Sequence, residues 1–140
     1  MKEIIGLFGT CGKSRWREKI AIPIIEEAGK KYFNPNKKNW NPKDSIREYH
    51  HLTTDKVILS AISNETSSYG SLGELGWTIL GALSRGQKVG LYFEEDLSKL
   101  KGTKRRLREL VKKHVKSINN KNFYYAKSIE DLAKWAVKQL

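Results

Sequence analysis

The segment GTCGKSRWR, residues 9–17, combines glycines, a cysteine and cations in a spacing that suits anion binding or nucleophilic chemistry. Gly9 and Gly12 allow backbone N–H groups to approach a ligand, and the start of a following helix favours an anion. Cys11 and Arg17 also have the Cys-x5-Arg spacing of cysteine phosphatases, in which a helix N-terminus stabilises the thiolate. The segment therefore predicts either a ligand cradle or a nucleophile loop.

Three interpretations of this loop differ in how well the spacing fits. A nucleotide-triphosphate loop needs a glycine five residues before Gly12, where the chain has Leu7. A phosphatase loop would hold the bulky Trp16, and no Asp-Pro sequence follows to supply a general acid. A cradle for a phosphate-free or monophosphate ligand, with charge from Arg15 and Arg17, fits the glycines, and so does a plain tight turn. On this loop alone, the ligand cradle and the plain tight turn both stay open as interpretations.

A second loop, SYGSLGELGW at residues 68–77, places Glu74 about one turn into a helix. A glutamate there commonly complements the helix dipole, and the helix start favours its ionised form. An ionised carboxylate in a cleft is also a suitable nucleophile for an electrophilic sugar carbon. Tyr69, Gly70 and Ser71 precede it in the loop and are candidate ligand contacts.

Strand and helix patterns alternate along the whole chain. We expect the first helix to be capped by Ser14, kinked at Pro23 and ended by Gly29, and the last helix to be capped by Ser128. Such alternation predicts an α/β fold, specifically a flavodoxin-like, doubly wound, five-stranded parallel sheet of order 2-1-3-4-5, in a single domain of residues 1–140. The expected strands are 3–9, 30–35, 56–63, 87–93 and 122–126, and the expected helices are 14–29, 42–54, 71–86, 98–118 and 128–140.

This topology brings the two loops together. In open parallel sheets, ligands bind beyond the carboxyl ends of the strands where the strand order reverses, here between strands 1 and 3. The loop at residues 9–14 follows strand 1, and the loop at residues 64–71 follows strand 3. We therefore expect them to face each other across one cleft.

The combined motifs resemble the nucleoside 2-deoxyribosyltransferase superfamily, most closely the branch with the pattern GTCG-x-S-x-W-R found at residues 9–17. Residues 32–35 (YFNP), 53–59 (TTDKVIL) and 73–89 (GELGWTILGALSRGQKV) match that branch in type and order. The resemblance covers about residues 3–93, and the last third of the chain matches only in general layout.

The resemblance implies the same sheet and cleavage of the N-glycosidic bond of a nucleoside or nucleotide. It implies Glu74 as the nucleophile, transfer of the sugar to another base or to water, no cofactor, and a homo-oligomer. Relatives carry an aspartate about six residues before the nucleophile, where this chain has Ser67-Ser68-Tyr69. They also carry an acidic residue on the helix before strand 3, and Glu48 of this chain lies one position away from it. The group that protonates the leaving base thus stays open. Candidate substrate contacts are Gly9, Thr10, Cys11, Gly12, Ser14, Arg17, Asn34, Tyr69, Gly70 and Ser71.

Several aromatic and polar residues have a structural interpretation beside a functional one. We expect Trp16 and Trp77 to be core residues rather than base-stacking ones, and Asp55 to be a cap or turn residue. Asn34 either contacts a ligand or fixes the turn before Pro35. His50 and His51 lack neighbours with metal-ligand spacing, so no metal site is expected.

Charge and composition limit the partners. The chain has 27 basic and 15 acidic residues, a net charge of +12, and much of this charge lies in residues 101–116. We expect Lys104, Arg105, Arg106 and Arg108 to form a solvated face. Nucleic-acid binding is one interpretation of the charge, and electrostatic steering of a small anionic substrate is the favoured one.

We expect a cytoplasmic protein without membrane contact. The sequence has one cysteine, and it shows neither an apolar run of membrane-spanning length nor an export signal. A catalytically silent nucleotide-binding module, a polyanion-binding protein and a cysteine phosphatase remain alternatives to the N-glycosidase.

Overall fold

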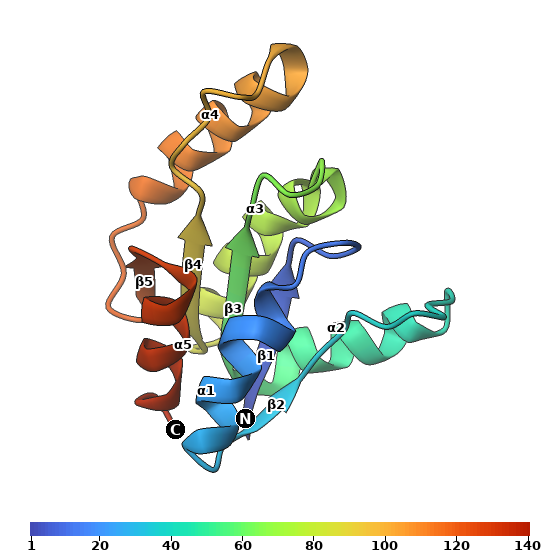
Figure 1. The fold of residues 1–140 in the computed structure, drawn as a ribbon. Coiled ribbons are helices and arrows are strands. Elements are labelled where there is room, and N and C mark those ends of the chain that lie inside the picture. The colour runs from blue at the N-terminus through green and yellow to red at the C-terminus, as the bar shows by residue number, and fades with distance from the viewer.

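The computed structural model describes residues 1–140 and shows five parallel strands in one sheet, with helices on both faces (Figure 1). The strand order is β2-β1-β3-β4-β5, as the sequence predicts. This confirms the α/β, flavodoxin-like arrangement. The strands are β1 (Lys2–Gly9), β2 (Lys31–Phe33), β3 (Asp55–Ile62), β4 (Lys88–Phe93) and β5 (Phe123–Ala126).

The helices divide between the two faces of the sheet. One hydrophobic cluster joins β1, β3 and β4 to side chains of α2, α3 and α4, and a second cluster joins the sheet to α1 and α5. Because both faces are covered, the strand interiors are apolar, and Val57 to Ala61 of β3 are all buried. The helices are α1 (Ile22–Glu27), α2 (Asp44–Thr54), α3 (Tyr69–Ser84), α4 (Gly102–Lys116) and α5 (Ile129–Val137). No helix is both long enough and apolar enough to cross a membrane.

The first helical segment differs from its prediction. It begins with a π-helical turn, η1 (Arg17–Ala21), that continues into α1, and Ser14 does not cap it. Pro23 lies in the first turn of α1 and has no N–H to donate backward, so the ladder of hydrogen bonds changes its spacing just before the proline. Gly29 follows the helix at a φ of 65° and ends it as expected.

The helix boundaries around the second loop also shift. Helix α3 begins at Tyr69 rather than residue 71, after Ser68 in the left-handed region at a φ of 55°. Helix α4 begins at Gly102, four residues later than predicted. The predicted cap of α5 is confirmed, because Ser128 Oγ accepts the backbone N–H of Asp131 at 3.0 Å.

Candidate functional site

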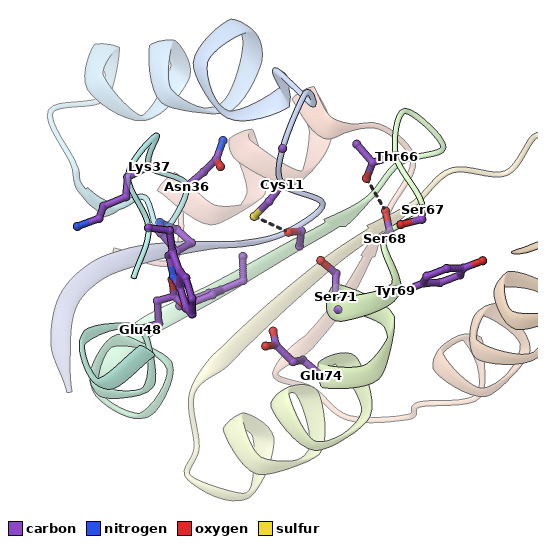
Figure 2. A pocket seen from close by; sticks show the side chains of 16 residues that line it. Cys11, Asn36, Lys37, Glu48, Thr66, Ser67, Ser68, Tyr69, Ser71 and Glu74 are labelled. Atoms are coloured by element: carbon purple, nitrogen blue, oxygen red, sulfur yellow. Dashed lines mark hydrogen bonds between the residues drawn. The ribbon is translucent and has the colours of Figure 1, made fainter. Parts of the chain in front are cut away.

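A pocket of about 550 Å³ lies at the carboxyl ends of β1 and β3, at the position where the strand order reverses (Figure 2). The loops after both strands contribute to its wall, as the topology predicts. Helix α2 and the segment after β2 form the remaining sides. The lining residues are Phe8, Gly9, Cys11, Gly12, Pro35, Asn36, Lys37, Trp40, Glu48, Thr66, Ser67, Ser68, Tyr69, Gly70, Ser71 and Glu74.

Gly9 fixes how closely the first loop approaches β3. Its φ is 101°, and a Cβ at this position would lie 2.4 Å from the backbone oxygen of Ala61. The backbone N–H of Thr10 then donates to the same oxygen at 2.8 Å. Only glycine permits both the positive φ and this close contact, so the residue shapes the pocket floor through the backbone.

Hydroxyl groups tie the two loops to each other. Thr10 Oγ1 accepts the backbone N–H of Ser63 at 3.0 Å and lies 2.8 Å from Ser68 Oγ. Ser68 Oγ in turn donates to the carbonyl oxygen of Ser63 at 3.2 Å. Thr10 and Ser68 are both buried. Thr10, proposed from the sequence as a substrate contact, therefore supports the pocket from below and does not line it.

Arg17 lies inside the first loop rather than facing the pocket. Its guanidinium donates to the carbonyl oxygens of Leu7, Thr10 and Gly9 at 2.8, 2.7 and 3.2 Å. The side chain is fully buried, and this burial lowers the pKa of the guanidinium, an effect that Cys11 opposes. The loop thus wraps around the cation with its carbonyl groups, so the sequence-based assignment of Arg17 to the substrate is corrected to a structural role.

Two further predicted contacts are placed outside the pocket wall. Ser14 is buried, and its hydroxyl donates to Glu65 Oε1 at 3.0 Å. Asn34 Oδ1 accepts the backbone N–H of Asn36 at 3.0 Å, which is the turn-fixing role that the sequence left open. Both residues therefore hold loops that line the pocket.

Cys11, Gly12, Tyr69, Gly70 and Ser71 do line the pocket, as predicted. The Cys11 side chain is exposed, and its Sγ donates to the carbonyl oxygen of Gly9 at 3.2 Å. The cysteine and the arginine of the Cys-x5-Arg pattern are therefore neighbours, with Arg17 Nη2 at 3.5 Å from Sγ. Because the guanidinium is enclosed by carbonyl oxygens, it is not presented to a phosphate in the pocket.

Glu74 and Glu48 approach the pocket from two different helices. Glu74 on α3 points into the hollow and is open to solvent, and Glu48 on α2 lies across from it (Figure 2). Partial desolvation raises the pKa of the Glu74 carboxyl, and the negative charge of Glu48 adds to the increase. The direction of this shift is opposite to the one expected from the helix start, because Glu74 lies beyond the first turn of α3 and desolvation and the charge of Glu48 have the larger effect on its pKa.

Glu48 is held in place by an aromatic side chain. Trp40 Nε1 donates to Glu48 Oε1 at 2.6 Å, and both residues line the pocket. Half of the Trp40 surface is exposed, so its ring is available to a ligand. The two carboxylates therefore face one cavity with an aromatic ring beside them, an arrangement that serves nucleophilic attack and proton transfer at a polar, ring-bearing substrate.

Sequence reasoning missed the contribution of the segment after β2. Pro35, Asn36, Lys37 and Trp40 form one side of the pocket. The signal was available, because β2 is the other neighbour of β1 and its carboxyl end lies at the same edge of the sheet. Phe8 and the hydroxyl residues Thr66, Ser67 and Ser68 complete the lining and were not proposed as contacts either.

The structure also places Trp16, Trp77 and Asp55, for which we expect structural roles from the sequence. Trp16 is 2% exposed and belongs to the core, as predicted, whereas Trp77 is 55% exposed on α3 and does not. Asp55 is buried and pairs with His51 Nδ1 at 3.0 Å, consistent with its structural interpretation. Burial raises the pKa of Asp55, an effect that His51 opposes. No group of three or more His, Cys, Asp or Glu side chains is placed to hold a metal ion.

Arg108 is not part of a solvated face. It is buried, and its Nη2 donates to the carbonyl oxygens of Thr66 and Ser63 at 3.0 and 3.4 Å. Burial lowers the pKa of its guanidinium. This arginine of α4 therefore anchors the helix to the loop that lines the pocket.

Comparisons of the chain with protein-family models, with curated proteins and with solved structures give no match.

Proposed function

We propose that the protein cleaves the N-glycosidic bond of a nucleoside or nucleotide, with Glu74 as the nucleophile. The observation that carries this proposal is the position of the Glu74 carboxylate, open to the pocket at the switch point of the sheet and facing Glu48. The motif residues Gly9, Cys11 and Gly12 line the same pocket, so the two parts of the resemblance to deoxyribosyltransferases meet at one place.

The chemistry requires an ionised Glu74. One carboxylate oxygen attacks C1′ of the sugar, the C1′–N bond breaks, and its electron pair leaves with the base. The transition state has oxocarbenium character, and the negative carboxylate stabilises the positive charge that develops on the sugar. An ester between Glu74 and C1′ results. Attack by water or by a second base then breaks that ester and restores the carboxylate.

The leaving base needs a proton, and Glu48 is the group in the pocket best placed to give one. It shares the cavity with Glu74, and its charge acts on the Glu74 carboxyl. With Glu74 as the nucleophile and Glu48 as the acid, the pair divides the two roles as the carboxyl groups of retaining glycosidases do.

The other walls of the pocket suit a nucleoside. Phe8 and Trp40 offer aromatic surface for a base, and the hydroxyl groups of Ser67 and Ser71 offer hydrogen bonds to a sugar. Gly70, in the first turn of α3, lines the pocket, and the first backbone N–H groups of a helix have no partner within it. A polar group of the sugar or a phosphate oxygen would satisfy them.

A nucleotide-binding module without turnover is the second candidate. The segment Ser67-Ser68-Tyr69 favours it, since it offers hydroxyl groups and no carboxylate to the pocket where deoxyribosyltransferases have an aspartate.

One experiment tests both candidates. The protein is incubated with a panel of nucleosides, nucleoside monophosphates and dinucleotides, and mass spectrometry measures freed base while calorimetry measures binding. Release of base from at least one compound supports the N-glycosidase. Binding without release over many hours supports the silent module, and absence of both contradicts each of them.

A further inference from the structure

Helix α4 concentrates the positive charge of the chain. Its 15 residues include seven lysines and arginines and one acidic residue, Glu109, so this helix supplies half of the net charge of +12. Figure 1 shows that α4 projects beyond the carboxyl ends of β3 and β4, on the side of the sheet where the pocket opens. A polyanion approaching the pocket therefore meets this helix first.

Arg108 fixes α4 relative to the pocket. Its buried guanidinium donates to the carbonyl oxygens of Thr66 and Ser63, and Thr66 also lines the pocket. The charged helix and the pocket wall thus share a buried hydrogen-bonded contact.

Three exposed cations precede Arg108 toward the start of α4. Lys104 and Arg105 lie four and three positions before Arg108 and share its face of the helix, and Lys101 immediately precedes the helix in an extended conformation. We call these three residues the basic ridge. The ridge continues the Arg108 face toward the helix start, past the point where the helix leaves the body of the protein.

Arg105 forms an exposed ion pair with Glu109 at 2.8 Å. The cations of α4 outside the ridge serve other contacts or face away. Lys112 and Lys116 pair with Glu95 at 2.5 and 3.1 Å. Arg106 and Lys113 are exposed and lie on the side of the helix opposite its buried residues Arg108 and Val115. These positions provide a matched set of cations away from the pocket.

Tyr69 connects the pocket to the basic ridge. It lines the pocket, it is 48% exposed, and Figure 2 shows its ring directed away from Glu74 and toward α4. Tyr69 is also one of the groups that act to raise the pKa of Arg108, against the larger effect of burial, so the two side chains are near each other. An exposed aromatic ring beside a row of cations is a stacking platform for a base of a single strand.

The charge inside the pocket has the opposite sign. Glu48 and Glu74 both line it, and its one cation, Lys37, pairs with Asp44 at 2.8 Å. Phosphate groups are therefore repelled from the carboxylates and attracted to the α4 side. A ligand that spans both regions has a neutral base and sugar at one end and phosphodiesters at the other.

We propose that the basic ridge and Tyr69 bind single-stranded nucleic acid, and that one nucleotide of the bound strand enters the pocket. This inference rests on the proposed function for the fate of that nucleotide and deepens it by naming the substrate class. The phosphodiesters lie along Lys101, Lys104 and Arg105, and a neighbouring base stacks on Tyr69. A single strand is favoured over a duplex because a base must be unpaired and unstacked to enter a pocket.

Fluorescence anisotropy with a labelled 12-nucleotide DNA strand tests the binding surface, using Glu74→Gln as the background so that no turnover occurs. The test variant carries Lys101→Gln, Lys104→Gln and Arg105→Gln. Its matched control carries Lys113→Gln, Lys121→Gln and Arg106→Gln, which remove the same number of lysines and arginines elsewhere. The test variant should bind at least about tenfold more weakly, and the slope of log K against log salt should fall by about 2, whereas the control should change little.

Two further arms separate this surface from unspecific attraction. Tyr69→Ala should weaken strand binding by about tenfold without changing the salt slope, because it removes stacking and no charge. A duplex of the same sequence should bind more weakly than the strand, although it carries more charge per length. Equal losses in the two charge variants, tighter duplex binding, or binding to phosphatidylserine vesicles or polyglutamate in place of the strand would each overturn the proposal.

The experiments distinguish failure of the N-glycosidase proposal from failure of the strand-binding proposal. If the wild-type protein binds the strand through the ridge but frees no base from it or from the nucleotide panel, the binding inference stands and the N-glycosidase proposal falls. If base is freed from mononucleotides while no strand binds, the N-glycosidase proposal stands and the binding inference falls.

Discussion

The hydroxyl groups of Thr10 and Ser68 lie 2.8 Å apart and join the loop after β1 to the loop after β3. The two residues are 58 positions apart in the chain and both are buried. This contact lies beneath the pocket and sets the distance between the glycine turn at Gly9 and the start of α3. The geometry presented to a ligand thus depends on a polar link between a residue beneath the pocket, Thr10, and a residue of its lining, Ser68.

Thr10→Val should loosen this link. Valine has the shape of threonine but neither accepts the N–H of Ser63 nor donates to Ser68, so a buried backbone donor loses its partner. We expect the free energy of unfolding to fall by about 1–3 kcal/mol, measured by urea denaturation. Thr10→Ser keeps the hydroxyl and should lose less. Equal stability of the valine variant and the wild type would show that the link contributes nothing.

Glu74→Gln should stabilise the protein near neutral pH. The pKa of Glu74 is raised in the folded state, so folding disfavours its ionised form, and the cost is fully present only above that raised pKa. The neutral amide removes this cost. We expect a gain of about 0.3–0.5 kcal/mol at pH 7.5, a small value because solvent at the exposed carboxylate screens the effect.

The pH dependence checks the sign of this effect. Below about pH 4 the carboxyl is protonated in the folded and unfolded states, so the gain in melting temperature should disappear there. Thermal unfolding from pH 3.5 to 8 measures it. A gain that stays constant across this range would mean that the charge of Glu74 is not its cause.

Glu48→Gln should lower the pKa of Glu74. Desolvation raises that pKa first and the negative charge of Glu48 second, and the substitution removes only the second effect. Carbon-detected NMR titration of the Glu74 carboxyl measures the change without relying on activity. Glu130→Gln, on α5, serves as a control and should leave the titration unchanged. An unchanged Glu74 titration in Glu48→Gln would show that the two carboxylates do not interact across the pocket.

Cys11→Ser separates the N-glycosidase from a cysteine phosphatase. Cys11 lines the pocket, but its partner in the Cys-x5-Arg pattern, Arg17, is enclosed by the carbonyl groups of its own loop. We expect base release to change by less than about threefold, as for substitutions outside the reacting groups. The variant and the wild type are also assayed with p-nitrophenyl phosphate. Phosphate release by the wild type that disappears in Cys11→Ser would favour the phosphatase instead.

The sheet could be predicted from the sequence because the same alternation of strand and helix patterns recurs along the chain. Each strand is a short apolar run and each connection carries a helical pattern, so the order of elements and the switch point follow from general rules. The positions of Gly9 and Glu74 at one cleft follow from that topology alone.

Side-chain directions were less predictable, because they depend on contacts that are distant in the chain. From the sequence we expect Arg17 to contact the substrate and Arg108 to lie on a solvated face, yet both side chains turn inward and donate to backbone carbonyl groups. Trp77 lies in a helix rich in small residues, and only the assembled fold shows that its side faces outward. The π-helical turn before Pro23 likewise depends on a local change of hydrogen-bond spacing that periodicity does not reveal.

The most direct measurement of the central claim is the rate of base release by Glu74→Gln on the best substrate of the panel, compared with the wild type and with Glu130→Gln. We predict a loss of about 10³-fold or more in kcat for Glu74→Gln and no loss for Glu130→Gln, because Glu74 lines the pocket and Glu130 lies outside it. Release at the wild-type rate by Glu74→Gln would contradict the assignment of the nucleophile.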